Sequence, residues 1–470
     1  MLMNTQDNIA VVGIKGAPRQ VEAIADFISG GIEHGCGACI GLEIEHFVVT
    51  REGQEPVTYE GDASRGQAGV GAILDELAAY YDARIYEDHE DGSRSLIGLS
   101  RLKANVTLEP GAQLEISIGP AVRLSTLHQL YTRFRTELDP ILERHGYELL
   151  SLGYHPSACA FELPLLPKQR YHYMDEYFTS TGSHGICMMR ATASTQVSID
   201  FASEEDAVRK YRVAMALGPL LSFITDNSPI FEGMPVHGVG NGEGSAGDTA
   251  GSNESQRTLP TGARSGLPIP PRMARTAIWE DVDPARSTTP PHTFEDRFGF
   301  ADYASSLLAA PAVFSLQYDD DLHKHAVYQG MRANAEVYGA QALDLERVEH
   351  ILSLFFFDVR FKTYIEIRMA DSLPAEYAFS YAALIKGLFY RAETMERYGA
   401  LAERLTPEEI SLAKQTLMLE GFDALVYGRP ASEWLDELLG EAAKGLDADE
   451  QPYLMPLAEL VENRRTLIDD

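Results

Sequence analysis

The sequence predicts an α+β fold in which a sheet with one charged face is combined with amphipathic helices. The first observation is that four segments alternate apolar and polar residues, the period that places the two sets on opposite faces of a strand. These segments are 41–45, 113–117, 195–200 and 363–371. The second observation is that several longer segments have apolar residues three or four positions apart, as in helices packed against a core.

The first part of the chain predicts strands and helices in alternation. Pro18 suits the first turn of a helix, and the Pro110-Gly111 pair is typical of a turn between strands. Pro140 is expected to interrupt a helix, because proline lacks the amide hydrogen that the helix needs. We therefore expect helices from Pro18, across 70–81 and across 124–145, and strands at 40–50, 95–99, 103–109 and 113–118.

The second part of the chain is predicted to be mainly helical apart from two of the alternating strands. A helix that starts near Glu204 should end by about Thr225, because the residue before Pro229 disfavours helical geometry. Thr406 is a suitable N-cap, since it is followed by Pro407 at the first helical position and by an acid at the third. Helices are therefore expected at 204–225, 375–405 and 406–470.

Composition and length favour a globular protein with one large domain. Hydrophobic residues make up 45% of the chain and aromatic residues 9%, which is enough for a substantial core. We expect a catalytic domain at 1–400 and a C-terminal helical extension at 401–470. The segment Val236 to Pro271 is rich in Gly, Ser, Thr and Asn, and we expect a mobile loop there. Loops of this length are functional or disordered, and a flap over the site is one interpretation.

The charge of the chain limits its partners. A formal net charge of -31 argues against nucleic acids and anionic membranes, because both require clustered Lys and Arg. The sequence contains no apolar run long enough for a transmembrane helix, and Met1 to Ala10 lacks the basic start and apolar core of a secretory signal. We therefore expect a cytoplasmic protein with small-molecule partners, as a monomer or a homodimer.

The four cysteines, Cys36, Cys39, Cys159 and Cys187, are too few for a disulfide framework in 470 residues. Cys36 and Cys39 form a C-x-x-C pair with His34 nearby, a spacing that can serve redox or zinc chemistry. A zinc site would need a second pair of ligands, and none is evident. The alternative is a turn that leads into the first acidic strand.

The charged face of the predicted sheet indicates a metal site. Close carboxylates repel one another, and buried charges need partners. Mg²⁺ or Mn²⁺ is the usual solution, since these ions take oxygen ligands and commonly accompany nucleotide phosphates. The alternative for each strand is that its charged face lies in water.

Several long motifs occur in an order that is typical of one family. The first is TLEPGAQLEISIGP at 107–120, and it is followed by PKQRYHYMDEYF, STQVSIDFASEEDAVRKYR, NSPIFEG, RTAIWEDVDPARS, FGFADY and VRFKTYIEIRMADSLP. The first motif closely resembles the EPGGQFELSG-type signature of plant and proteobacterial glutamate-cysteine ligases. The resemblance extends over roughly residues 41–374.

The resemblance implies a glutamine-synthetase-like fold, with a curved, mainly antiparallel sheet that forms a funnel and with helices packed outside. It also implies a reaction in which ATP phosphorylates the γ-carboxylate of glutamate. The amine of cysteine then attacks the acyl phosphate to give γ-glutamylcysteine, a precursor in thiol biosynthesis such as that of glutathione. The implied cofactors are ATP and Mg²⁺ or Mn²⁺.

The resemblance also implies roles for individual residues. Arg368 and Glu366 would be catalytic, with Arg368 near the transferring phosphoryl group, where a guanidinium fork can donate two hydrogen bonds. The implied metal ligands are Glu43, Glu45, Glu109, Glu115 and Glu366, and the implied ATP-binding residues are Lys168 and Arg368. The implied substrate-binding residues are Arg275, Arg286, Trp279, Gln113, Gln196, Arg170 and Tyr171.

Two alternatives remain open at the level of the sequence. A related carboxylate-amine ligase could use an amine other than cysteine. A non-catalytic protein could keep the nucleotide-binding funnel as a ligand sensor, although a sensor has no need to retain a phosphoryl-transfer cluster.

Overall fold

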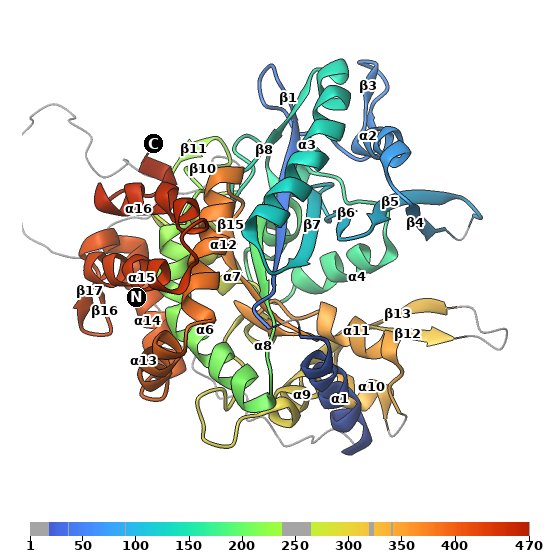
Figure 1. The fold of residues 1–470 in the computed structure, drawn as a ribbon. Helices are drawn as coiled ribbons and strands as arrows, with labels where there is room; N and C mark the ends of the chain where they lie inside the picture. Colours follow the sequence, from blue (N-terminus) through green and yellow to red (C-terminus); the bar gives the residue numbers. More distant parts are fainter. Residues whose placement is uncertain are drawn as a thin grey trace, which may run out of the picture.

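The computed structural model describes residues 18–469 except 36, 90, 237–264, 319–323 and 340–341. Within these residues nine strands form one sheet in the order β14-β15-β9-β1-β7-β6-β5-β4, and β8 also pairs with β1 (Figure 1). Every pairing in this sheet is antiparallel. The strands are β1 (Ile40–Thr50), β4 (Ala83–Asp88), β5 (Arg94–Arg101), β6 (Ala104–Leu108), β7 (Leu114–Ala121), β8 (Tyr147–Leu150), β9 (Ser194–Ile199), β14 (Val359–Phe361) and β15 (Ile365–Asp371).

The four strands with alternating residues lie side by side in the sheet as β15, β9, β1 and β7. The register places Glu43 opposite Gln196, and Glu45 opposite Glu115. Because side chains alternate between the two faces of a strand, these polar residues share one face. The prediction of a sheet with one charged face is therefore confirmed.

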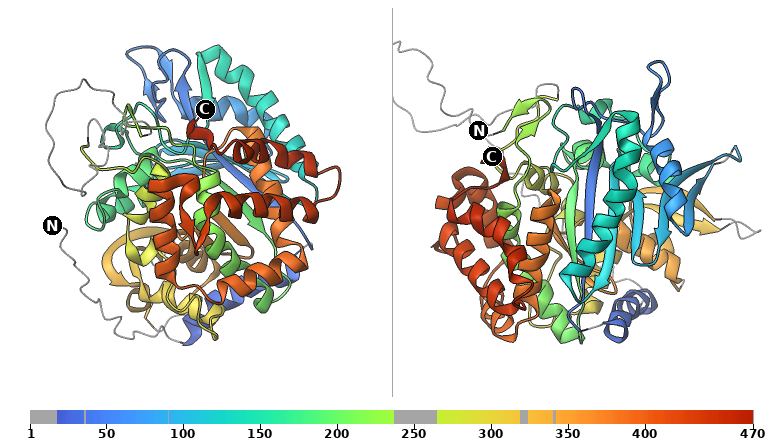
Figure 2. Two further views of the ribbon diagram at one scale, coloured as in Figure 1. Left: turned by 90° about the vertical axis from the view of Figure 1, so that its left-hand side faces the viewer. Right: turned by 45° about the horizontal axis from the view of Figure 1, so that its top comes forward.

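Helices cover the apolar face of the sheet, where Leu42, Ile44 and Ile367 are fully buried. Contacts join α2 to β5, α3 to β7, α6 to β15 and α12 to β1. The right-hand view of Figure 2 shows α3 lying along this sheet. The helices of the first three quarters of the chain are α1 (Pro18–His34), α2 (Val70–Leu77), α3 (Leu124–His145), α4 (Gln169–Phe178), α5 (Gly185–Ala191), α6 (Glu204–Ile224), α7 (Ala274–Glu280), α8 (Pro284–Ser287), α9 (Phe300–Ala309), α10 (Asn334–Tyr338) and α11 (Leu345–Ser353).

The C-terminal quarter of the chain is mainly helical, as predicted, and packs on α6 and α12. Thr406 caps α14, and its side chain and that of Glu409 form the reciprocal pair of hydrogen bonds known as a capping box. Figure 1 shows these helices gathered on one side of the sheet. They are α12 (Ala375–Phe389), α13 (Ala392–Ala402), α14 (Pro407–Glu420), α15 (Ala431–Gly445) and α16 (Met455–Glu462).

Short hairpins and 3-10 turns connect these elements. The longest hairpin joins β12 (Pro311–Tyr318) to β13 (Lys324–Ala333). The others are β2 (Gly61–Asp62) with β3 (Gln67–Ala68), β10 (Ile230–Phe231) with β11 (Met234–Pro235), and β16 (Leu425–Val426) with β17 (Arg429–Pro430). The 3-10 turns are η1 (Ala78–Tyr80), η2 (Ala160–Glu162), η3 (Gly421–Asp423), η4 (Gln451–Leu454) and η5 (Leu467–Asp469).

The predicted interruption of a helix at Pro140 is wrong. Two other predictions, the loop at 236–271 and the C-x-x-C pair, fall wholly or partly on residues that the structure does not describe. Pro140 does not interrupt α3, which continues from Leu124 to His145. The buried residues Phe134, Leu138 and Ile141 anchor the helix on both sides of the proline, so tertiary packing offsets the missing hydrogen bond. Most of the loop predicted at 236–271 lies outside the described residues, and so does Cys36 of the C-x-x-C pair. Among the described helices, none has both the length and the apolar character needed to cross a membrane.

Candidate active site on the polar face of the sheet

Glu366 lies at the centre of a cluster of cations on the polar face. Its side chain is fully buried, and three positive side chains lie within 2.8 Å of its carboxylate oxygens, namely Arg360 at 2.7 Å, Lys362 at 2.7 Å and Arg368 at 2.8 Å. Burial acts to raise the pKa of Glu366, but these cations outweigh burial and hold the pKa well below its usual range. Glu366 is therefore ionised.

Arg368 connects Glu366 to the acids of the neighbouring strands through Gln196. Nη1 of Arg368 donates to Glu366 and to the amide oxygen of Gln196, and Nε2 of Gln196 donates to Glu45 at 2.9 Å. Glu45 also accepts hydrogen bonds from the backbone amide and the hydroxyl of Ser194, at 2.7 Å and 2.8 Å. A hydrogen-bonded chain thus crosses three adjacent strands, β15, β9 and β1.

The other acids of this face, Glu43, Glu45 and Glu115, have fewer positively charged neighbours than Glu366. The pKa of Glu43 is raised to about 8 by burial and by the charges of Glu115 and Glu366. Burial, together with Glu109 and Glu115, raises the pKa of Glu45 to about 8 as well. Burial is also the main reason that the pKa of Glu115 is raised. Glu45 is buried, and Glu43 and Glu115 are half-buried. Carboxylates that are poorly solvated and repel one another have an unmet need for positive charge.

This excess of buried and half-buried acid fits a divalent cation. Oxygen ligands with a full negative charge suit Mg²⁺ and Mn²⁺, and the acids come from neighbouring strands. In the part of the chain that the structure describes, no three His, Cys, Asp or Glu side chains are close enough together to surround one ion. The described acids therefore do not form a ready-made metal site. Glu43, Glu45 and Glu115 remain candidate ligands, whereas both carboxylate oxygens of Glu366 are already paired with cations.

A narrow pocket lies beside this cluster, between α7 and β15. Its lining residues are Arg275, Thr276, Trp279, Phe356, Phe357, Asp358, Arg368 and Met369. The Arg275 guanidinium lies over the ring of Trp279, 5.2 Å from its centroid, and donates to the carbonyl oxygens of Met369 and Arg368 at 3.3 Å and 3.4 Å. We name this the α7 pocket. It places two guanidinium groups, those of Arg275 and Arg368, at one site.

Arg275 is a buried cation, and burial weakens the hydration of its guanidinium. Only 4% of this residue is exposed, and burial lowers the pKa of its guanidinium although Asp371 and Glu45 act in the opposite direction. An arginine nevertheless keeps its charge at physiological pH. The cavity is small, at about 10 Å³. Since a desolvated cation attracts an anion strongly, this cavity is suited to a single small anionic group such as a carboxylate.

The P-K-x-R-Y residues lie at the start of α4, next to the acids. Lys168 is the N-cap residue of α4, and its ammonium lies 5.2 Å from the centre of the Tyr171 ring. The pKa of Lys168 is lowered by burial and by the charge of Arg170, with Glu109 acting against them. Arg170 donates to the hydroxyl of Ser353 at 3.3 Å. Lys168 lies near Glu109, just after β6, and near Glu115 of β7, and both cations are separate from the lining of the α7 pocket.

Two of the residues predicted to bind substrate have internal partners. Gln113 donates to the carbonyl of Thr192 and accepts from the amide of Gly111, both at 2.8 Å. Arg286 is fully buried. It donates to the carbonyls of Leu354 and Pro311 and lies 3.1 Å from Asp283. Arg275 also donates to two carbonyl oxygens, but it lines the α7 pocket, whereas Arg286 does not and lies in the core.

No role was predicted for the cations that precede Glu366. Arg360 lies opposite Glu366 in the antiparallel pair of β14 and β15, and Lys362 follows in the turn between these strands. A signal was present, because Arg360 and Lys362 alternate with Val359 and Phe361 in the same way as the charged residues of the next strand.

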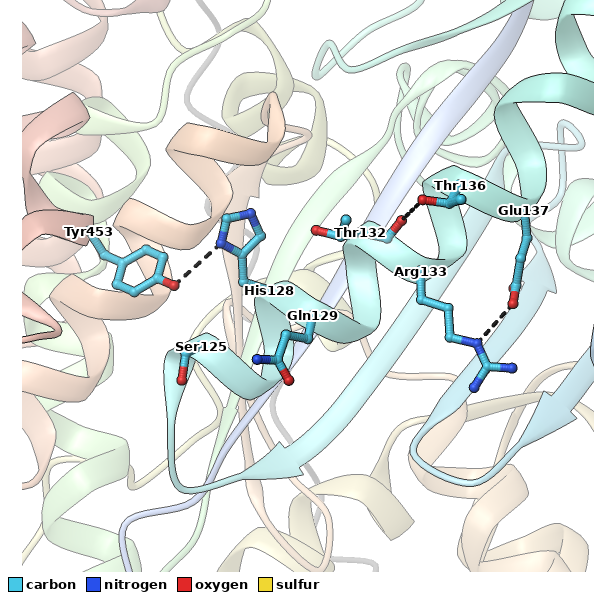
Figure 3. A pocket seen from close by; sticks show the side chains of 8 residues that line it. All are labelled: Ser125, His128, Gln129, Thr132, Arg133, Thr136, Glu137 and Tyr453. Atoms are coloured by element: carbon cyan, nitrogen blue, oxygen red, sulfur yellow. Dashed lines mark hydrogen bonds and ion pairs between the residues drawn. The ribbon is translucent and has the colours of Figure 1, made fainter.

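A second hollow, of about 600 Å³, lies on the outer side of α3, away from the acids. Figure 3 shows that its lining comes from one face of this helix together with Tyr453 of η4. Glu137 of this hollow pairs with Arg133 at 2.8 Å and with the buried Arg101 at 2.6 Å. Glu137 therefore has its positive partners within the protein, and none of the lining residues of this hollow belongs to the polar face of the sheet.

Comparisons with known proteins agree with this arrangement. The family model described as "Glutamate-cysteine ligase family 2(GCS2)" matches residues 39–466. The chain is 29% identical over 418 residues to "Glutamate--cysteine ligase B, chloroplastic" of Oryza sativa subsp. japonica, which covers 87% of this chain and 74% of the relative. It is 27% identical over 456 residues to "Glutamate--cysteine ligase, chloroplastic" of Medicago truncatula, which covers 94% of this chain and 80% of the relative.

A solved structure shares the fold. The crystal structure of a glutamate-cysteine ligase from Francisella tularensis in complex with AMP matches with a TM-score of 0.50 and 12% sequence identity. The match covers 90% of this chain and 82% of that chain. At this level of identity the match supports the arrangement of the sheet and helices, and the predicted fold is confirmed.

Proposed function

The chain belongs to glutamate-cysteine ligase family 2, and from this premise we propose that it joins the γ-carboxylate of L-glutamate to the amine of L-cysteine with consumption of ATP. The product is γ-glutamylcysteine. The observation that best supports this function within the site is the position of Arg368, which lies both on the acidic face of the sheet and in the lining of the α7 pocket. A phosphoryl-transfer centre and a site for a carboxylate substrate therefore meet at one side chain.

The proposed reaction has two steps. An oxygen of the glutamate γ-carboxylate attacks the γ-phosphorus of ATP, so that ADP leaves and γ-glutamyl phosphate forms. The amine of cysteine then attacks the acyl carbon, the amine loses a proton, and inorganic phosphate leaves as the amide bond forms. Phosphoryl transfer of this kind depends mainly on positioning and on electrostatic stabilisation. A protein nucleophile is not required.

Arg368 is proposed to stabilise the transferring phosphoryl group. Its guanidinium is held in place by Glu366 and Gln196, so its orientation is fixed before the substrate binds. A preorganised cation of this kind costs no reorganisation when charge develops in the transition state. Glu366 has two roles in this proposal, since it orients Arg368 and belongs to the acidic face.

Arg275 is proposed to hold a carboxylate of glutamate in the α7 pocket, with Trp279 as one wall. Glutamate carries an α-carboxylate in addition to the γ-carboxylate that reacts, and a buried guanidinium is a suitable partner for it. Because Arg275 and Arg368 both line the pocket, one arginine can anchor the substrate while the other faces the reacting end.

ATP and a divalent cation are proposed to occupy the acidic face near α4. Mg²⁺ held by Glu43, Glu45 and Glu115, with Glu109 and the cation-paired Glu366 nearby, would neutralise phosphate charge. Lys168 and Arg170, at the start of α4, are proposed to attract the nucleotide phosphates. The AMP complex of the Francisella tularensis relative supports a nucleotide site within this fold.

The test is an assay of phosphate release from Mg-ATP by the purified protein. Release should require both glutamate and cysteine, and mass spectrometry should identify γ-glutamylcysteine. EDTA should stop the reaction, and added Mg²⁺ should restore it. Turnover with an amine other than cysteine would assign a different acceptor. Nucleotide binding without turnover for any amine would refute the ligase function and favour the ligand sensor.

A further inference from the structure

Lys414 is a buried cation that joins three separate segments of the chain. It lies in α14, and only 6% of its side chain is exposed. Its ammonium lies 2.5 Å from Glu280 at the end of α7 and 2.6 Å from Asp358, just before β14. Burial alone would lower the pKa of Lys414, but Asp358 and Glu280 outweigh burial and raise it. Lys414 is thus a fully charged link between two acids.

The two acids belong to two walls of the α7 pocket. Glu280 directly follows Trp279, which lines the pocket from α7. Asp358 itself lines the pocket from the other side, and its carbonyl accepts a hydrogen bond from the backbone amide of Arg368 at 2.8 Å. The ammonium of Lys414 therefore ties together the segments that carry Trp279 and Arg368.

The opposite end of α7 is also anchored. The backbone amide of Met273, the N-cap residue of α7, donates to the buried carboxylate of Asp226 at 2.8 Å. Helix α7 has only 7 residues, so its own hydrogen bonds are few and its position depends on such external contacts. Asp226 fixes the start of the helix, and the Glu280 to Lys414 pair fixes its end.

From this geometry we propose that Lys414 is a positioning residue that sets the spacing of the α7 pocket and thereby the affinity for the acid substrate. The proposal rests on the proposed function, because the pocket is taken to bind glutamate. Without the ammonium, the carboxylates of Glu280 and Asp358 would face each other in a poorly solvated space and repel. The walls would then move apart, and the guanidinium groups of Arg275 and Arg368 would no longer converge on one ligand. The helices after residue 400 are thus part of substrate recognition.

The test compares two buried lysines in steady-state kinetics of the full-length protein. K414M keeps most of the side-chain volume and removes the charge. K386M is the matched control, because Lys386 is also buried and also pairs with an acid, Glu450, at 2.5 Å, but neither residue lines the α7 pocket. We expect K414M to raise KM for glutamate by about tenfold, with a much smaller change in KM for ATP. K386M should leave the ratio of the two KM values unchanged.

A second pair of variants keeps the proposal testable if K414M does not fold. E280Q removes the α7 half of the link at a side chain that is 29% exposed, and it should raise KM for glutamate in the same direction by a smaller factor. K414R should restore most of the affinity for glutamate, because it keeps the positive charge. The proposal would be overturned if the ratio of KM for glutamate to KM for ATP were the same in E280Q as in the wild type. It would also be overturned if K414M and K386M raised KM for glutamate and KM for ATP to the same extent. Failure of the proposed function would be distinct, since the wild-type protein itself would then form no γ-glutamylcysteine.

Discussion

The polar face of the sheet and the α7 pocket hold their charged groups in different ways. On the sheet, Glu43, Glu45 and Gln196 lie on adjacent strands, and the register of the antiparallel pairs fixes their distances. In the α7 pocket, the charged groups come from a short helix, the segment before β14 and strand β15, and Lys414 from α14 connects two of these segments. The first region is built by local geometry and the second by tertiary packing.

This difference separates two kinds of function. Groups fixed by strand register are well suited to phosphoryl transfer, in which small displacements are costly. A pocket assembled from several segments can bind one substrate and adjust its spacing through remote contacts. Variants on the sheet should therefore change kcat, and variants around the pocket should change KM for glutamate.

The largest effect is expected from R368K. Lysine keeps one positive charge near Glu366 but cannot form the planar fork that contacts Gln196, Glu366 and a phosphoryl group together. We expect kcat to fall by about 10²–10³-fold, as for the loss of one preorganised donor, while the thermal midpoint changes little. The measurement is single-turnover formation of γ-glutamylcysteine with saturating substrates. A variant that keeps near-normal kcat and shows only a raised KM would contradict the assignment of Arg368 to the chemical step.

The second effect is expected from R275K. The guanidinium of Arg275 is oriented by two carbonyl oxygens of β15 and by the ring of Trp279, and lysine cannot reproduce these contacts. We expect KM for glutamate to rise by about 10- to 100-fold, since a hydrogen bond between charged groups contributes about 1.5–3 kcal/mol. R133K on the exposed face of α3 is the control and should behave as the wild type. An unchanged KM would place the carboxylate site elsewhere.

The same contrast explains what the sequence could predict. The alternating residues of the four strands predicted the sheet, its charged face and the acids on it, because a strand has a fixed period of two. The ion pair between Arg360 and Glu366 could also have been predicted from that pattern. The ion pairs of Lys414 could not, because its partners Glu280 and Asp358 lie far from it in the sequence. The core position of Arg286 was missed for the same reason, since its partners Leu354 and Pro311 are distant in the chain.

The third prediction concerns the pH dependence of stability, and it uses E43Q. The pKa of Glu43 is raised to about 8, whereas in the unfolded chain it lies near its usual value, so folded protein holds a proton that unfolded protein loses. Stability therefore falls as pH rises from about 4.5 to 8. In EDTA, E43Q should be more stable than the wild type by about 1–2 kcal/mol at pH 8, since water entry and relaxation moderate the cost of a buried charge. Near pH 4 the two proteins should be equally stable.

Urea titrations at both pH values measure this difference, and E52Q in the exposed turn after β1 is the control. Mg²⁺ should stabilise the wild type more at pH 8 than at pH 6, because the cation competes with the bound proton. A variant of the α7 pocket, such as R275K, should keep the same dependence of Mg²⁺ stabilisation on pH as the wild type. If Mg²⁺ stabilised E43Q as much as the wild type, Glu43 would not belong to the metal site.

The smallest effect is expected from T406A, which separates the stability of α14 from the contact made by Lys414. Thr406 and Glu409 form the capping box at the start of α14, and loss of such a cap typically costs about 1 kcal/mol. Lys414 lies about two turns further along and is held by Glu280 and Asp358, so the ammonium should keep its place. T406A should lower the thermal midpoint slightly and leave KM for glutamate unchanged. A rise in KM as large as that in K414M would mean that the pocket depends on the whole helix, and the link through one ammonium would no longer be needed to explain it.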